Sequence, residues 1–193
     1  AKRFLKISGG YGNAVDLFKV RKEEDRKVMM KLNVDYMNLG LVDALFRVKG
    51  RFGIISSVIP ELNHIYPTYR WHIVKKISPA DPTLLSLNEL LQKIPRQNCV
   101  AFIPFGVGHH CDHLLVKKAC EKVFTKVFYY SEFPYNIRRN SYDCPEPYLL
   151  TKDLRINHKS KDELLKIYKT QYRGLFIKGM PRHKEVYFLP NSL

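Results

Sequence analysis

The chain has 193 residues, of which 45% are hydrophobic and 26% are charged, and its 33 Lys and Arg against 18 Asp and Glu give a net charge of +15. This length and apolar fraction predict one domain spanning residues 1–193 and exclude intrinsic disorder. The longest stretch without a charged residue, 97–111, is too short and too polar for a membrane span, which needs about 20 apolar residues.

Alternating helix-like and strand-like segments predict an α/β layered domain. Charged helix formers over 21–32 indicate a helix, and residues 36–41 indicate a short strand that runs into a turn. Residues 63–77 carry β-forming side chains, although a proline interrupts them. A helix that begins at Asp81-Pro82-Thr83 is expected to stop before Pro95.

The second half of the chain contains a strand–helix–strand pattern. The near-continuous apolar run 99–105 is typical of a strand covered on both faces. An amphipathic helix over 112–124 and a β-forming run over 126–130 follow, and such a unit normally makes a right-handed parallel crossover. Three segments complete the chain: a surface excursion over 134–154, a charged helix over 159–176 and a strand over 185–189.

The cysteine content indicates the cellular compartment. None of the four cysteines forms a C-x-x-C pair, which speaks against a structural zinc ribbon. Cysteines this sparse are typical of buried thiols in a reducing environment, and residues 1–10 lack the apolar core of a signal peptide. We therefore expect a cytoplasmic protein. The absence of an initiator Met is typical of a processed product or a fragment.

One stretch concentrates side chains that can bind a metal or act in catalysis, and it reads Gly106-Val107-Gly108-His109-His110-Cys111-Asp112-His113. It lies where the apolar strand ends and the next helix begins, which is the edge at which open α/β sheets bind ligands. Neutral imidazole is the commonest nitrogen ligand of zinc, and a neighbouring carboxylate can fix its tautomer. A surface turn capped by Asp112 fits equally well, because ligands from one loop do not complete a metal site.

The run from Pro104 to Val116 resembles the second motif of the PIG-L/LmbE-like deacetylases, His-x-Asp-His followed by an apolar helix, here His110-Cys111-Asp112-His113. Two other stretches agree with that family in order and spacing. The first is similar to its Arg-x-x-Glu helix and leucine-glycine–aspartate loop, and comprises Arg21 to Arg26 followed by Asn38 to Arg47. The second is similar to its Tyr-x-Ser/Thr-Gln helix and reads Tyr168-Lys169-Thr170-Gln171. The resemblance spans residues 20–189.

The resemblance implies a Rossmann-like, three-layer fold with a mostly parallel sheet. It also implies a mononuclear Zn²⁺ hydrolase that removes an acetyl group from an N-acetylated sugar, such as an N-acetylglucosamine glycoconjugate, anionic ones included. In that chemistry the metal polarises the amide carbonyl and activates a water. His113 would then be a zinc ligand, and His110 would stabilise the tetrahedral intermediate or protonate the leaving amine. Asp112 would orient or tune a neighbouring imidazole.

The resemblance further makes Arg21 and Asp43 candidates for contacts with sugar hydroxyls or phosphate. Ordinary structural roles stay open for both residues. Arg21 is equally compatible with a helix-surface charge paired with Glu24 or Asp25. Asp43 is equally compatible with a helix or turn cap.

The chain departs from the family at its beginning. The family's first motif, His-Pro-Asp-Asp-Glu, supplies two zinc ligands and the catalytic aspartate, and it does not occur here, so the first strand, helix and second strand look absent. Because catalytic zinc needs three protein ligands, we do not expect the chain as given to be a competent enzyme. Two explanations stay open: the C-terminal portion of a longer deacetylase, which we favour, and a degenerate member without metal chemistry.

Two other function classes are compatible with parts of the sequence. A non-catalytic basic module for RNA or anionic glycolipid would use the net charge and the aromatic run 128–130 near Arg138-Arg139. That run fits a sheet core better, so nucleic acid is not the expected partner. A thiol nucleophile at Cys111 would use the neighbouring imidazoles and the helix N-terminus. We set it aside because function requires a complete site.

Overall fold

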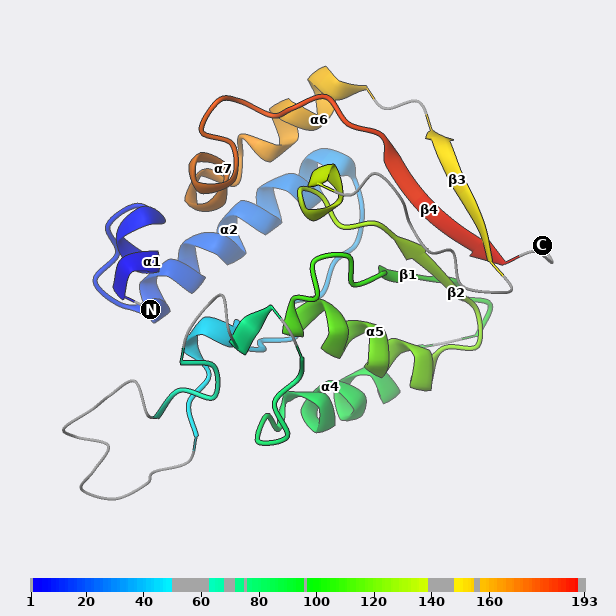
Figure 1. Ribbon diagram of the computed structural model, residues 1–193, viewed down its shortest axis with the longest axis horizontal. Coiled ribbons are helices and arrows are strands. Elements are labelled where there is room, and N and C mark those ends of the chain that lie inside the picture. Colours follow the sequence, from blue (N-terminus) through cyan, green and yellow to red (C-terminus); the bar gives the residue numbers. More distant parts are fainter. Residues whose placement is uncertain are drawn as a thin grey trace. The chain divides into compact units, whose positions relative to one another are not determined.

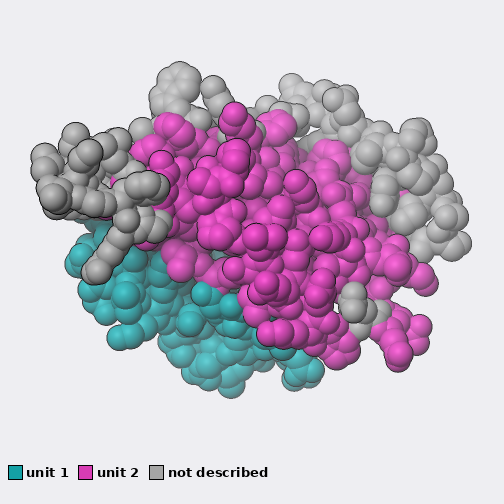
Figure 2. All heavy atoms as spheres, turned by 90° about the horizontal axis from the view of Figure 1, so that it is seen from below, with its two compact units in different colours: residues 1–40, 155–184 teal, residues 41–154, 185–193 magenta. Residues whose placement is uncertain are grey.

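The structure, a computed structural model, describes residues 2–49, 63–67, 72–74, 76–95, 97–138, 148–154 and 157–190. The chain divides into two compact units. Unit 1 comprises residues 1–40 and 155–184, and unit 2 comprises residues 41–154 and 185–193. Figure 2 gives each unit its own colour. Within the described residues, no helix has both the length and the apolar composition needed to cross a bilayer.

Unit 1 is helical, with α1 at Lys2–Ile7, α2 at Ala14–Leu32, α6 at His158–Leu165 and α7 at Lys169–Leu175 (Figure 1). The sequence sets both ends of α2. The Asn13 side chain accepts the Asp16 N–H at 3.0 Å, which satisfies an otherwise unpaired donor of the first turn. Asn33 ends the helix in the left-handed conformation. The predicted helix over 21–32 is confirmed and is longer at its N-terminus.

The helix predicted over 159–176 is two helices, α6 and α7. A residue of α2 binds the start of α7. The Glu24 carboxylate accepts hydrogen bonds from the Thr170 N–H at 3.0 Å and from the Thr170 hydroxyl at 2.6 Å. These are contacts between residues 146 positions apart. An acceptor supplied to the N–H of Thr170 replaces the carbonyl that a continuous helix would use. The prediction of one helix is therefore wrong at this point.

The strand predicted over 36–41 is also wrong. These residues are irregular and pair with no strand among the described residues. The Asn38 side chain accepts the Gly40 N–H at 3.0 Å, so a local side-chain turn takes the place of ladder hydrogen bonds.

The β-forming stretch 63–77 is only partly described, since residues 68–71 and 75 lie outside the described residues. His64 forms an isolated antiparallel bridge with Val48. The stretch therefore contributes one bridge, and none of its described residues belongs to a strand of the sheet.

Unit 2 contains a four-stranded mixed sheet of order β1-β2-β4-β3. The strands are β1 at Ala101–Pro104, β2 at Val127–Tyr130, β3 at Tyr148–Leu154 and β4 at Glu185–Pro190. β1 and β2 are parallel, with Ala101 opposite Val127, whereas β2–β4 and β4–β3 are antiparallel. The α/β class is confirmed. The expectation of a mostly parallel sheet is corrected, because the C-terminal strand returns antiparallel between β2 and β3.

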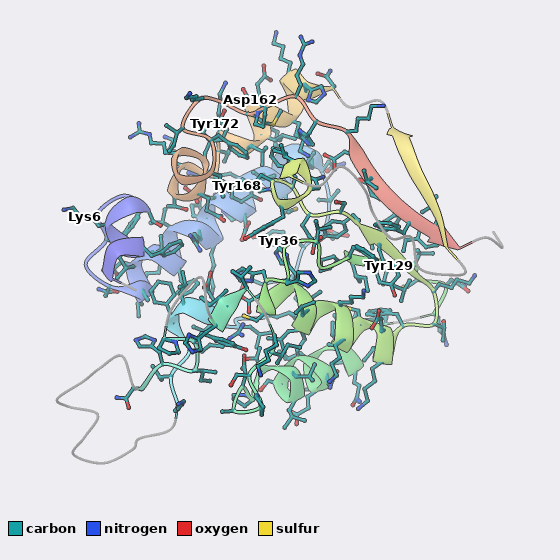
Figure 3. All side chains as sticks on the ribbon, in the orientation of Figure 1. Lys6, Tyr36, Tyr129, Asp162, Tyr168 and Tyr172 are labelled. Atoms are coloured by element: carbon teal, nitrogen blue, oxygen red, sulfur yellow. The ribbon has the colours of Figure 1, made fainter. Side chains whose placement is uncertain are left out.

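The predicted strand–helix–strand unit is confirmed as β1, α5 at Cys111–Val123, and β2. The predicted helix after Asp81 is α4, at Thr83–Gln92, and it packs against α5 (Figure 1). Tyr129 of β2 is buried, and its hydroxyl donates to Glu121 of α5 at 2.7 Å. This residue of the aromatic run 128–130 thus belongs to the core, as the sequence favours. Figure 3 shows Tyr129 on its strand.

The surface excursion predicted over 134–154 contains structure at both ends. A short 3₁₀ helix, η4, spans Tyr135–Arg138, and β3 spans Tyr148–Leu154. Residues 139–147 lie outside the described residues. The prediction is therefore wrong for 148–154, which pair with β4.

Candidate active site at the start of helix α5

The turn between β1 and α5 needs its glycines. Gly106 has φ +93°, a region that side chains with a Cβ rarely adopt, and its carbonyl accepts the His109 N–H at 3.0 Å. At Gly108 a Cβ would lie 2.3 Å from the ring of Tyr135, so glycine is required there by close approach. The turn therefore places residues 109–113 next to the segment that follows β2.

Glu132 fastens this turn to the end of β2. Its side chain is buried, and its two oxygens accept the Gly106 N–H at 2.6 Å and the Val107 N–H at 3.1 Å. Burial alone would raise the pKa of Glu132, but contact with His113 and the N–H donors outweigh it and hold the pKa below its ordinary value. The carboxylate is therefore ionised behind the turn.

His113 lies in the first turn of α5 and is oriented by Glu132. Its Nδ1 is shielded from solvent and lies 3.1 Å from Oε1 of Glu132, while 28% of its side chain remains exposed. A carboxylate facing Nδ1 favours the tautomer that carries the proton on Nδ1. Nε2 of His113 then keeps its lone pair.

His110 has the opposite arrangement. It is the N-cap residue of α5, and its Nδ1 accepts the Asp112 N–H at 3.2 Å. A neutral ring that accepts at Nδ1 carries its proton on Nε2. Burial lowers the pKa of His110, although the charge of Asp112 opposes the shift. The rings of His110 and His113 are 5.2 Å apart between centroids.

The Asp112 side chain is held by a loop that is distant in sequence, residues 42–47. Its carboxylate accepts hydrogen bonds from the Arg47 guanidinium and, at 3.2 Å, from the Ala44 N–H. The buried Arg47 also donates to Asp81 at 2.7 Å, just before α4. Asp112 thus ties the start of α5 to residues 42–47, and Arg47 extends the link to the segment before α4.

The two residues predicted to contact substrate belong to different units. Asp43, in unit 2, caps the 3₁₀ helix η1 at Ala44–Phe46, because its Oδ1 accepts the Leu45 N–H at 2.9 Å. Its charge also raises the pKa of His110, against the larger effect of burial. Arg21, on α2 of unit 1, holds its guanidinium 5.2 Å from the ring centroid of Phe4. The alternative role of Asp43 as a helix cap is confirmed, and the substrate contacts of Asp43 and Arg21 stay predictions.

One group of three potential metal ligands occurs in the described part of the chain: His110, Cys111 and Asp112, whose donor atoms lie within 4.8 Å of one another. These three residues fit a zinc ion poorly. Cys111 belongs to an apolar cluster with Ile65 and Ile73, and burial raises the pKa of its thiol to about 12. The Asp112 oxygens are engaged by a guanidinium and an N–H. The protonated thiol also argues against a nucleophilic Cys111.

Sequence reasoning identified His110, Asp112 and His113, and it missed Glu132. A signal for Glu132 was available: it follows β2, and the carboxyl ends of adjacent parallel strands meet at one edge of a sheet. Arg47 lies inside the loop compared with the family, but nothing in its spacing predicts that it pairs with Asp112 across 65 positions.

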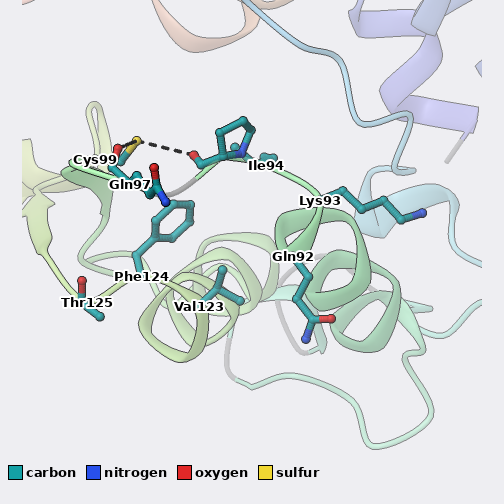
Figure 4. Close-up of a pocket in the computed structure, with 9 residues that line it drawn as sticks. Gln92, Lys93, Ile94, Gln97, Cys99, Val123, Phe124 and Thr125 are labelled. Atoms are coloured by element: carbon teal, nitrogen blue, oxygen red, sulfur yellow. Dashed lines mark hydrogen bonds between the residues drawn. The ribbon is translucent and has the colours of Figure 1, made fainter.

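A separate cavity of about 620 Å³ lies at the N-terminal ends of β1 and β2, whereas the turn before α5 follows the C-terminal end of β1. Figure 4 shows its lining, which includes Lys93, Phe124 and the exposed Cys99. The Cys99 thiol contacts the Pro95 carbonyl at 3.5 Å. The cavity brings no imidazole or carboxylate together, so it offers no alternative to the turn before α5.

Comparisons with protein-family models, with curated proteins and with solved structures found no match to the chain. The two imidazoles before and within α5, with the groups that face them, are therefore the features that bear on function.

Proposed function

We propose that the chain carries part of the active site of a Zn²⁺-dependent amide hydrolase of the PIG-L/LmbE type, which removes an acetyl group from an N-acetylated sugar or glycoconjugate. The observation that supports the proposal is the different partner that faces Nδ1 in each of two neighbouring imidazoles. His113 faces Glu132 with Nδ1, and His110 accepts the Asp112 N–H at Nδ1. One ring therefore offers a lone pair at Nε2, and the other offers a proton.

His113 suits a zinc ligand. Histidines bound to zinc usually donate their other ring N–H to a carboxylate or carbonyl, and Glu132 provides that carboxylate at 3.1 Å. Bound zinc would polarise the acyl carbonyl and lower the pKa of a water. Catalytic zinc takes three protein ligands, and the proposal assigns one of them to this turn.

His110 suits the group that stabilises the developing oxyanion. Its Nε2–H is a neutral donor, and a donor held in place before the reaction acts without reorganisation. The lowered pKa of His110, caused first by burial, keeps the ring neutral near pH 7. The same proton is available to the leaving nitrogen when the tetrahedral intermediate collapses.

Asp112 and Arg47 act as positioning residues in this proposal. The Asp112 N–H occupies Nδ1 of His110, and the Asp112 carboxylate is clamped by Arg47 and the Ala44 N–H. The clamp fixes the first turn of α5, and the turn fixes the tautomer of His110. Asp43 stands at the N-terminal side of this clamp as the cap of η1.

Zinc content tests the ligand assignment, measured on a full-length protein that joins this chain to the family's first motif, because this chain alone is not expected to be a competent enzyme. We expect His113→Ala to lose bound zinc, and His110→Gln to keep it while lowering turnover of an N-acetylglucosaminyl substrate about 100-fold or more. His109→Asn is the matched control, because His109 is exposed and has φ 51°, which asparagine tolerates. Equal zinc content in wild type and His113→Ala would contradict the assignment.

A further inference from the structure

Positive charge accumulates in one segment of unit 1. Residues 164–184 contain six Lys or Arg and no Asp or Glu. Acidic residues border the segment on both sides, Asp162 and Glu163 before it and Glu185 after it. Asp162, on α6, pairs with Lys166 and accepts the Tyr172 hydroxyl, and Figure 3 labels both Asp162 and Tyr172. Between these borders, residues 173–182 contain Arg173, Lys178 and Arg182 and no acidic residue. We call residues 173–182 the basic tip.

The basic tip is a fixed turn at the end of α7. Phe176 is buried, and its N–H donates to the Tyr172 carbonyl at 2.8 Å. The Phe176 and Tyr172 rings lie 5.2 Å apart, and the Gly179 N–H donates to the Phe176 carbonyl at 3.0 Å. Because Phe176 points inward, its two neighbours point outward.

Those two neighbours are aliphatic. Leu175 is 51% exposed and Ile177 is 89% exposed, and the cations Arg173, Lys178 and Arg182 around them are exposed as well. A turn normally carries small polar residues, so two outward aliphatic side chains among cations call for a partner that is apolar and anionic. A bilayer with anionic headgroups has both properties at its interface.

We propose that the basic tip docks the protein on an anionic lipid bilayer, with Ile177 and Leu175 inserted at the headgroup boundary and Arg173, Lys178 and Arg182 on the headgroups. Nucleic acid fits the tip less well. Single-stranded nucleic acid is bound by aromatic side chains that stack on bases, and Leu175 and Ile177 cannot stack. This docking is independent of the hydrolase proposal, since the tip belongs to unit 1 and the imidazoles belong to unit 2.

Vesicle flotation tests the docking. We expect the protein to bind vesicles of phosphatidylcholine with about 30% phosphatidylserine, to bind pure phosphatidylcholine much less, and to lose binding as salt rises. Ile177→Ser should weaken binding about 10-fold through the lost apolar burial. Arg173→Gln with Lys178→Gln should weaken it about 30-fold, from about 1 kcal/mol per cation.

Matched variants separate the tip from general properties of the surface. Leu85→Ser removes an aliphatic side chain that is 68% exposed on α4, and Lys118→Gln with Lys122→Gln removes two exposed cations of α5. Both should bind anionic vesicles like wild type. The proposal is overturned if Ile177→Ser binds like wild type, if the α5 pair weakens binding as much as the tip pair, or if an RNA probe requires Arg173 and Lys178 while vesicles do not.

Discussion

Glu132 holds three groups at once: the N–H groups of Gly106 and Val107 and the imidazole of His113. Its burial makes these contacts hard to replace with water. We expect Glu132→Gln to lower the free energy of unfolding by about 2–3 kcal/mol, because a buried charged acceptor becomes an amide whose NH₂ faces an N–H donor. Urea denaturation at neutral pH measures this. Glu89→Gln on α4 is the control, since Glu89 is exposed, and a loss as large in the control would contradict the role of Glu132.

Asp81 illustrates how a buried ion pair makes stability depend on pH. Burial alone would raise its pKa, but hydrogen bonds from Thr83 and Tyr66 and the charge of Arg47 lower it overall. The folded state then binds fewer protons than the unfolded state, so the stabilisation is present above the unfolded pKa of about 3.9 and is lost as pH falls through the folded value.

We expect Asp81→Asn to cost about 3 kcal/mol at pH 7, because it leaves part of the buried Arg47 charge unpaired. The difference from wild type should begin to shrink as the pH falls below about 4, where the carboxylate of the unfolded state is protonated, and should be lost only below the lowered pKa of the folded state. Unfolding in urea at several pH values checks this. A difference that stays constant down to acid pH would contradict the ion-pair account.

The cysteines differ in reactivity for a physical reason. Burial raises the pKa of Cys111 to about 12 and that of Cys120 to about 11, whereas Cys99 is exposed. Since the thiolate is the reactive form, iodoacetamide at pH 8 should alkylate Cys99 in the native protein and leave Cys111 and Cys120 unmodified until unfolding. Peptide mass spectrometry reads out each site. Alkylation of Cys111 at the rate of Cys99 would refute its burial.

At the scale of elements, the break between α6 and α7 depends on Glu24. Thr170→Val removes the hydroxyl donor to a buried carboxylate and should cost about 1–2 kcal/mol, whereas Thr170→Ser keeps the donor and should cost less. Thermal or urea unfolding compares the two variants. Equal stabilities for valine and serine would show that the hydroxyl contributes nothing.

The sequence predicted elements well where local pattern determines structure. The strand, helix and strand over 101–130 follow from an apolar run, an amphipathic period and a second β-forming run. It failed where long-range contacts decide. β3 lies in a stretch rich in Pro, Asn and Arg and forms because β4 pairs with it, and the break before α7 depends on a carboxylate 146 positions away.

The candidate site follows the same division. His110 and His113 are visible in the sequence because a glycine-rich turn and His-x-Asp-His form a compact motif. The groups that face their Nδ1 atoms are not visible there, since these are the Glu132 carboxylate after the next strand and the Asp112 N–H at the helix start. The geometry around the motif thus comes from tertiary structure, which a single sequence does not encode in spacing.

At the scale of the whole molecule, part of the positive charge that gives the net +15 is concentrated in one segment. Residues 164–184 of unit 1 hold six cations and no anion. The imidazoles and their carboxylates lie in unit 2, where Asp112, Asp81 and Glu132 all engage partners. The two units therefore differ in chemistry: unit 1 carries the basic tip, for which we propose an anionic surface, and unit 2 carries the pair of imidazoles, for which we propose amide hydrolysis.

The pair of tautomers is the claim on which the hydrolase account depends, and nitrogen NMR of the protein labelled with ¹⁵N-histidine reads it directly. Above about pH 8, where unperturbed imidazoles are neutral, we expect the His113 proton on Nδ1 and the His110 proton on Nε2. His113→Gln and His110→Gln assign the two sets of signals. Finding both rings in the same tautomer, or His110 protonated on Nδ1, would contradict the account.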